Sequence, residues 1–272
     1  MLANTDTVIL GLGDSYLQGS EAGGAEYSFL NNYCNQKGFD CVNMGHEGIG
    51  NLGSVYKALI YDIDWSQWNN KYIFWMPTGL NRFDMSNRSW KPDDNWGVVH
   101  NSPIFTPFPN RHPHDKWSDS RKKLEKSLAE FTTPQTVRQD FLTAYQILKN
   151  FYDAKGFNKL LIFPAFNDET TRKNMKDFRK TPATQGIYKM NEGLFKRMGW
   201  EYYITVDGSN NYFQWLCQKA GLPSSTQPHS TMETTPDNIR NETVEKWIAP
   251  RSHATRKANI VFSRRLLEVL DL

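Results

Sequence analysis

The stretch "VILGLGDSYLQGSE", residues 8–21, carries an apolar run straight into a small polar triplet. The apolar, β-rich run over 7–12 predicts a buried strand. Gly13, Asp14 and Ser15 then follow at the point where that strand ends. The triplet is either only a turn into a helix, with Ser15 as an ordinary helix cap, or a device that presents Ser15 to a substrate.

Apolar runs alternate with helically spaced segments along the rest of the chain. We expect strands over 7–12, 39–45, 71–77, 158–166 and 200–208, and helices over 25–38, 51–63, 135–156, 186–199 and 253–270. This alternation predicts an α/β domain with a mainly parallel five-stranded sheet whose two faces are covered by helices. Ligands bind such sheets at the carboxyl ends of the strands, so a functional site is expected there.

Two segments interrupt the alternation. Residues 80–134 and 209–247 are rich in Pro, Asn, Asp and aromatic residues, and we interpret them as insertions that form lids or binding loops. The chain shows no internal repeat. We therefore expect a single domain over 1–272 that carries two insertions.

The overall composition excludes several classes of protein. The 272 residues include 32 basic and 29 acidic ones, a net charge of +3 that is too balanced to predict nucleic-acid binding. No segment approaches the roughly 20 apolar residues of a membrane span. The start "MLANTDTVILGLGDS" lacks the pattern of a signal peptide, so we expect a cytoplasmic protein or part of a larger particle such as a virion. The oligomeric state is left open.

The sequence predicts no metal site and no cofactor. Three cysteines (Cys34, Cys41, Cys217) match no metal motif and are expected to be reduced thiols. The segment "RHPHDKW" (111–117) favours an exposed loop over a metal site, because a proline separates its two histidines. The basic segment "RKNMKDFRK" (172–180) is interpreted as a solvated face, with binding of an anionic ligand as the alternative.

A glycine-rich segment follows the second predicted strand. In "NMGHEGIGNLG" (43–53), the glycines let the backbone approach a ligand and turn its amide groups toward an anion. Gly48, Gly50 and Gly53 also spell GxGxxG. That dinucleotide motif belongs after the first strand and needs an acid at the end of the next one, which "FWMPTG" lacks. A dinucleotide site is therefore not expected.

Two more polar groups are predicted at the same rim. "PTGLNRFD" (77–84) follows the third strand and contributes the side-chain amide of Asn81, and His253 precedes the last helix. Singly, such an Asn is typically a turn residue and a lone His is typically structural. Together with Ser15, they supply the nucleophile, the amide donors and the base that acyl transfer requires.

At this point the chain resembles the SGNH (GDSL-type) hydrolases. The resemblance rests on four blocks along the chain: Gly13, Asp14, Ser15 and Gly19; Asn43, Gly45 and Gly48; Gly79 and Asn81; and His253. It implies a three-layer α/β/α, flavodoxin-like domain and a hydrolase of ester bonds, with Ser15 as nucleophile and His253 as base. It also implies an oxyanion hole formed by the Ser15 amide, the Gly48 amide and the Asn81 side chain.

The sequence departs from the family pattern at two positions. Pro250 stands where the family carries an aspartate three residues before the histidine. The carbonyl of Pro250 or of a neighbour, Asp237 or Glu245 are the candidates to orient His253 in its place. Arg82 replaces a common aspartate after Asn81, and either binds an anionic substrate group or pairs with Asp84, the second being favoured.

The sequence therefore predicts a serine esterase acting on a small-molecule or carbohydrate ester, the preferred substrate being an O-acyl or O-acetyl group on a carbohydrate. Asp14, expected to brace the turn with its carboxylate, is assigned to substrate binding together with Arg82 and Trp96. Tryptophans in the two insertions form either a sugar-stacking platform or ordinary packing under long loops (Trp90, Trp96, Trp117, Trp215, Trp247). The alternative function is a non-catalytic carbohydrate-binding or particle-associated domain on the same scaffold.

Overall fold

The computed structural model describes residues 5–46, 49–78, 83–84, 104–105, 134–165, 202–223, 241–250 and 253–272. For 83–84, 104–105 and 134–138 the description is limited to the backbone. The helix expected over 186–199 lies outside the described residues.

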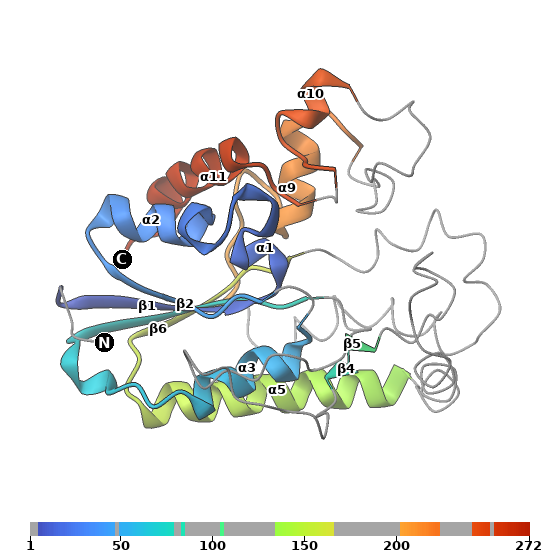
Figure 1. Cartoon of the computed structure of the whole chain (residues 1–272). Coiled ribbons are helices and arrows are strands. Elements are labelled where there is room, and N and C mark those ends of the chain that lie inside the picture. Colours follow the sequence, from blue (N-terminus) through green and yellow to red (C-terminus); the bar gives the residue numbers. More distant parts are fainter. Residues whose placement is uncertain are drawn as a thin grey trace.

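A parallel sheet forms the centre of the molecule, with strand order β2–β1–β3–β6 (Figure 1). Its strands are β1 (Thr7–Gly13), β2 (Asp40–Asn43), β3 (Asn70–Met76) and β6 (Lys159–Ile162). All three pairings are parallel, with β1 lying between β2 and β3. A first strand flanked by the second and third is the flavodoxin-like order, so the predicted α/β class is confirmed.

The described part of the sheet has four strands where five were expected. Of the expected strand over 200–208, the structure describes 202–208, where Tyr203 forms an isolated parallel bridge with Ile162. The segment stops following β6 because the backbone turns sharply at Asp207, which has a φ of 51°, and Val206 pairs back onto Ser209. A separate antiparallel pair, β4 (Phe83–Asp84) and β5 (Ile104–Phe105), lies inside the first expected insertion.

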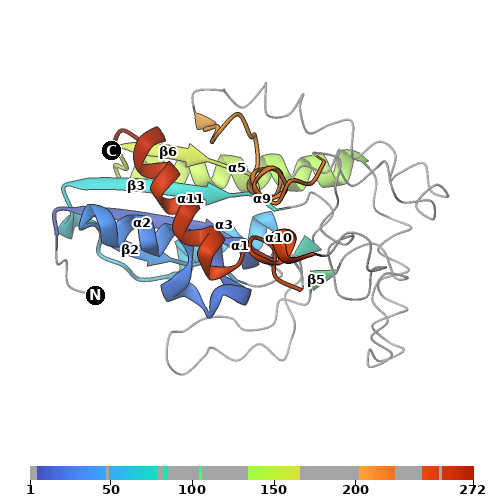
Figure 2. The same ribbon diagram turned by 90° about the horizontal axis from the view of Figure 1, so that it is seen from above.

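Helices cover both faces of the sheet (Figures 1 and 2). One face carries α1 (Ser15–Gln18), α2 (Phe29–Lys37), α9 (Tyr212–Lys219) and α11 (Arg256–Val269), and the other carries α3 (Asn51–Ile60) and α5 (Pro134–Ala154). The short helix α10 (Glu242–Glu245) and three 3-10 turns, η1 (Ser20–Ala22), η2 (Ala25–Tyr27) and η3 (Trp65–Gln67), complete the described elements.

The burial of β1 on both faces explains why its sequence is apolar from Val8 to Leu12. Ile9 packs into the core beneath α2 and α11, whereas Leu10 and Leu12 pack into the core beneath α3 and α5. Successive strand residues point to opposite faces, and here both faces are covered by helices. A strand with two buried faces therefore ends at a rim where only its last residues can meet a ligand.

The first part of the second expected insertion, 209–247, contains a packed helix. Residues 212–219 form α9, whose Tyr212 and Trp215 are fully buried against Phe262 of α11. Trp215 is thus a packing residue, and Trp247 is partly buried against the same core. Three other tryptophans considered for a sugar platform lie outside the described residues (Trp90, Trp96, Trp117).

Within the described part of the chain, no helix combines the length and apolar character that crossing a membrane requires.

Candidate active site

The turn between β1 and α1 is held by Asp14. Its Oδ1 accepts a hydrogen bond from the Tyr16 amide at 3.0 Å, which makes Asp14 the N-cap of α1. Its Oδ2 accepts from the Thr78 hydroxyl at 2.9 Å, and the residue is fully buried. The assignment of Asp14 to substrate binding does not fit this geometry, because both oxygens are engaged inside the protein. Since Asp14 caps the helix, the Ser15 hydroxyl is left for another partner.

That partner is His253, from the opposite end of the chain. The Nε2 atom of His253 lies 2.7 Å from the Ser15 Oγ atom. His253 precedes α11 in a loop closed by a bridge between Ile248 and Ala254 and by an Ala249 amide that donates to the His253 carbonyl at 2.8 Å. The structure therefore brings together two side chains that lie 238 positions apart and that the sequence predicts to be nucleophile and base.

The other ring nitrogen of His253 meets a residue that the sequence analysis did not consider. Glu21 Oε2 lies 2.8 Å from His253 Nδ1 and also accepts from the His253 backbone amide at 3.1 Å. Because a carboxylate only accepts, Nδ1 carries the proton and Nε2 is free to accept from the Ser15 hydroxyl. This is the tautomer in which imidazole acts as a base toward serine.

Of the expected candidates for orienting His253, those within the described residues do not contact Nδ1: Pro250 and Glu245 are exposed, and Glu21 is the partner of that atom. Asp237 lies outside the described residues. The ring of Tyr16 packs at 5.0 Å, centroid to centroid, from the ring of His253. Among the described residues, the groups on His253 are thus Ser15 and Tyr16 of α1 and Glu21 of η1.

The glycine-rich loop after β2 packs tightly against α1. A Cβ atom added to Gly45 would lie 2.6 Å from the Gln18 backbone nitrogen, so only glycine fits this approach. Asn43 fixes the loop by accepting from the Gly45 amide at 2.9 Å and donating to the Leu17 carbonyl at 3.0 Å. The loop is therefore anchored to the element that carries Ser15.

The end of β3 is tied to the same rim. Asn51 and Thr78 form a reciprocal pair, with the Thr78 amide donating to Asn51 Oδ1 at 2.8 Å and Asn51 Nδ2 donating to the Thr78 carbonyl at 3.1 Å. This pair positions the chain just before Gly79. Four predicted site residues beyond these anchors, Gly48, Asn81, Arg82 and Trp96, lie outside the described residues.

A buried lysine lies beneath the glycine-rich loop. Lys57 of α3 donates to the Met44 carbonyl at 3.4 Å, and burial lowers the pKa of its amine to about 8. No group of three or more His, Cys, Asp or Glu side chains within the described ranges is arranged to hold a metal ion.

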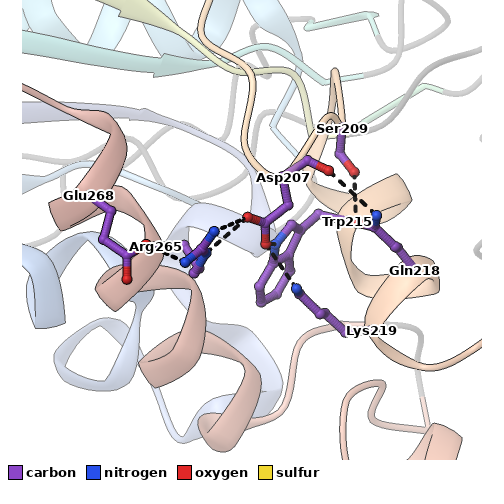
Figure 3. Close-up of polar contacts among 7 residues, drawn as sticks. All are labelled: Asp207, Ser209, Trp215, Gln218, Lys219, Arg265 and Glu268. Atoms are coloured by element: carbon purple, nitrogen blue, oxygen red, sulfur yellow. Dashed lines mark hydrogen bonds and ion pairs between the residues drawn. The ribbon is translucent and has the colours of Figure 1, made fainter.

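Asp207 lies in a network of ion pairs and hydrogen bonds that joins it to α9 and α11 (Figure 3). Asp207 Oδ1 accepts from Arg265 Nε at 2.9 Å and from Nη2 at 2.5 Å. Its Oδ2 accepts from Lys219 Nζ at 2.8 Å and from Trp215 Nε1 at 3.0 Å. Arg265, followed by Lys219 and Trp215, holds the pKa of the Asp207 carboxyl well below its usual range.

Solved structures similar to this chain include lipolytic and esterase proteins. A member of the lipolytic G-D-S-L family from Veillonella parvula is 10% identical, with a TM-score of 0.46 and coverage of 97% of this chain and 98% of that one. A lipolytic protein of the same family from Desulfitobacterium hafniense is 12% identical, with a TM-score of 0.44 and coverage of 97% and 99%. The psychrotrophic esterase EstA from Pseudoalteromonas is 12% identical, with a TM-score of 0.42 and coverage of 97% and 96%.

No protein-family model matches the chain, and no similar sequence was found among curated proteins. Because the structural similarities are this low, the function proposed below rests on the side chains of this chain.

Proposed function

We propose that the protein is a serine hydrolase that cleaves carboxylic esters through an acyl-enzyme on Ser15. The observation that carries the proposal is the 2.7 Å contact between Ser15 Oγ and His253 Nε2. A serine hydroxyl is a weak nucleophile until a neighbouring imidazole takes its proton, and this distance lies within the hydrogen-bond range needed for that transfer.

In acylation, Ser15 Oγ attacks the ester carbonyl carbon while His253 Nε2 takes the hydroxyl proton. The tetrahedral intermediate carries its negative charge on the former carbonyl oxygen. When it collapses, the bond to the alcohol oxygen breaks and His253 returns the proton to the leaving alcohol. Deacylation repeats these steps with water in place of Ser15, which releases the acid and restores the free serine.

The negative oxygen requires hydrogen-bond donors aimed at it. The Ser15 amide belongs to the first turn of α1, where N–H groups have no carbonyl partner inside the helix. We assign the Gly48 amide and the Asn81 side chain as the other donors. The anchoring of the Asn43–Gly45 turn and of Thr78 at the same rim supports this assignment.

For the substrate, we propose an O-acyl ester of a carbohydrate. The support is the aromatic content of the segment over 80–134, where Trp90, Trp96 and Trp117 occur. Planar aromatic rings offer apolar faces on which a sugar ring can stack. Trp96 and Arg82 remain the candidates for contact with the substrate.

The test is hydrolysis of a chromogenic acetyl ester by the wild type and by Ser15→Ala, followed by assay on acetylated and deacetylated oligosaccharides. Wild-type turnover that falls on the order of 10⁴-fold or more in Ser15→Ala supports the proposal, since loss of a nucleophile typically costs that much or more. Labelling with a fluorophosphonate provides an independent readout, because only an activated serine reacts.

Turnover that survives Ser15→Ala would reject Ser15 as the nucleophile. Absence of both turnover and labelling in the wild type would favour the non-catalytic carbohydrate-binding alternative. Acetyl release from a chromogenic ester but from no acetylated sugar would keep the esterase and reject the carbohydrate.

A further inference from the structure

We propose that Glu21 is the acid partner of His253, a positioning residue that replaces the aspartate missing at position 250. The inference rests on the proposed function, since it assigns a role within the same reaction. It also changes the architecture of the site, because the acid comes from the segment of the nucleophile and the histidine alone comes from the C-terminal segment.

The contacts of Glu21 favour orientation of the ring. One oxygen, Oε2, accepts from both the Nδ1 atom and the backbone amide of His253, at 2.8 and 3.1 Å. Two bonds to one residue fix the rotation of the imidazole relative to its own backbone. They also leave Nε2 pointing at Ser15, which is the task that the acid performs in a serine triad.

Burial makes this contact stronger than a surface ion pair. The side chains of His253 and Glu21 are 13% and 14% exposed. Exposed pairs are screened by water and contribute little, whereas partly buried charges interact through a lower effective dielectric constant. When the ring takes the Ser15 proton, the adjacent carboxylate therefore stabilises the imidazolium that forms.

The local fold explains how an acid so close to Ser15 reaches the base. The helix α1 ends at Gly19, whose φ of 76° is in the left-handed region, and the chain turns directly into η1, where Glu21 lies. The turn is tight, because the Gly24 amide donates to the Gly19 carbonyl and a Cβ atom on Gly19 would lie 2.8 Å from the Gly24 oxygen. Gly19 is thus required for the turn that brings Glu21 to the imidazole of His253, beside Ser15.

The experiment compares Glu21→Gln, Glu21→Asp and the matched control Glu26→Gln. Glu26 lies on the next 3-10 turn and is exposed. For Glu21→Gln we expect kcat to fall about 10²- to 10⁴-fold with little change in KM, as when other triad acids are neutralised. Glu21→Asp keeps the charge and is expected to retain at least about 10-fold more activity than Glu21→Gln. Glu26→Gln keeps wild-type kinetics.

A relocation variant separates the catalytic role from a structural one. Pro250 is exposed and has no backbone N–H, so Pro250→Asp removes no hydrogen bond donated by that backbone nitrogen. It places an acid three residues before His253, the position used by the family. In the background of Glu21→Ala, we expect Pro250→Asp to restore activity by about 10-fold or more, because the ring regains a carboxylate acceptor.

The proton on His253 Nδ1 provides a readout that a purely structural role would not move. The Nδ1 atom lies 2.8 Å from Glu21 Oε2, so its proton should give a far-downfield resonance. We expect this resonance to be lost in Glu21→Gln, and the measurement needs no turnover.

The outcomes distinguish the two proposals. Full activity in Ser15→Ala rejects Ser15 as the nucleophile, whereas the Nδ1 resonance still tests the pairing of Glu21 with His253. If Ser15→Ala is inactive but Glu21→Gln keeps wild-type activity, the serine esterase stands and Glu21 is rejected. If Glu21→Gln loses activity while the Nδ1 resonance persists, and Pro250→Asp gives no rescue of Glu21→Ala, Glu21 is only a structural residue.

Discussion

Glu21 and Asp207 are both carboxylates with little exposed surface, yet their partners differ in kind. The Asp207 carboxylate accepts hydrogen bonds from Arg265, Lys219 and the indole N–H of Trp215, and both basic side chains are permanently charged (Figure 3). Glu21 instead contacts the imidazole of His253, which also contacts Ser15. The carboxylate of Asp207, held between two permanently charged side chains, therefore links helices, whereas that of Glu21 lies beside a ring to which we assign a proton transfer.

The largest effect is expected for His253→Ala. If Glu21 and His253 belong to the catalytic site, esterase activity should fall on the order of 10⁴-fold or more, because the base is lost. The unfolding midpoint in urea should move less than in Asp207→Asn, since His253 lies in a loop and is not part of the hydrophobic core. A large loss of stability with retained activity would show that His253 and Glu21 have a structural role rather than a catalytic one.

For Asp207→Asn we expect the opposite pattern. Asn tolerates the left-handed backbone at this position, so the substitution removes the charge and leaves the turn intact. Loss of charge-assisted hydrogen bonds should lower the free energy of unfolding by about 2 kcal/mol, with esterase activity unchanged at 25 °C.

The pH dependence of stability gives Asp207 a second signature. The folded pKa of this carboxyl is lowered, so its contribution is present above the unfolded value near pH 4 and is lost as pH falls below it. The wild type should therefore lose stability faster than Asp207→Asn between about pH 4 and pH 2. Parallel curves for the two proteins would show that the ion pairs do not matter.

Lys57 is a buried cation whose one hydrogen-bond acceptor, within the part of the chain that the structure describes, is the Met44 carbonyl. Burial lowers its folded pKa to about 8, so the unfolded chain binds more protons between pH 8 and its own value near 10.4, and stability rises with pH there. Lys57→Met should remove that rise and increase the free energy of unfolding at pH 7 by about 1 kcal/mol. The exposed Lys246→Met serves as control, and a Lys57→Met protein that is less stable at pH 7 would contradict the expectation.

The smallest effect is expected for Glu268→Gln. Glu268 pairs with the outer side of Arg265 on the surface of α11, while Arg265 keeps its bonds to Asp207. Surface pairs one helical turn apart contribute little, so thermal unfolding should be indistinguishable from that of the wild type at low and at high salt. A clear decrease would show that Glu268 is needed to orient Arg265.

Much of the fold was predictable because its signals are local. The strand β1 and the second half of β3, from Ile73 to Met76, are apolar runs that are buried. The strand–turn–helix pattern predicts Ser15 and His253 at the rim. The helix α9 also has a local sequence signal, a capping residue followed by apolar residues at helical spacing. Asn211 caps the helix, and the aromatic residues 212, 213 and 215 continue at helical spacing with Leu216.

Glu21 was not predictable in this way, although it lies in the stretch that decided the fold. An acid six positions after the serine looks like an ordinary residue of a solvent-exposed turn. Its role depends on the left-handed turn at Gly19 and on a loop that arrives 232 positions later, as the contact between Glu21 and His253 shows. The spacing of residue types along the sequence predicts neither the direction of a turn nor a contact between residues 232 positions apart.

The long separation of Ser15 from His253 has a consequence for the protein during its own synthesis. The imidazole is made 238 positions after the hydroxyl, just ahead of a helix that docks onto α2 through contacts such as that between Gln36 and Ser263. A nascent chain therefore holds the Ser15 hydroxyl without its imidazole partner while those 238 positions are added. If the proposed function holds, reactivity toward esters arises only when the C-terminal helix docks, and the growing chain does not attack acyl groups before it has folded.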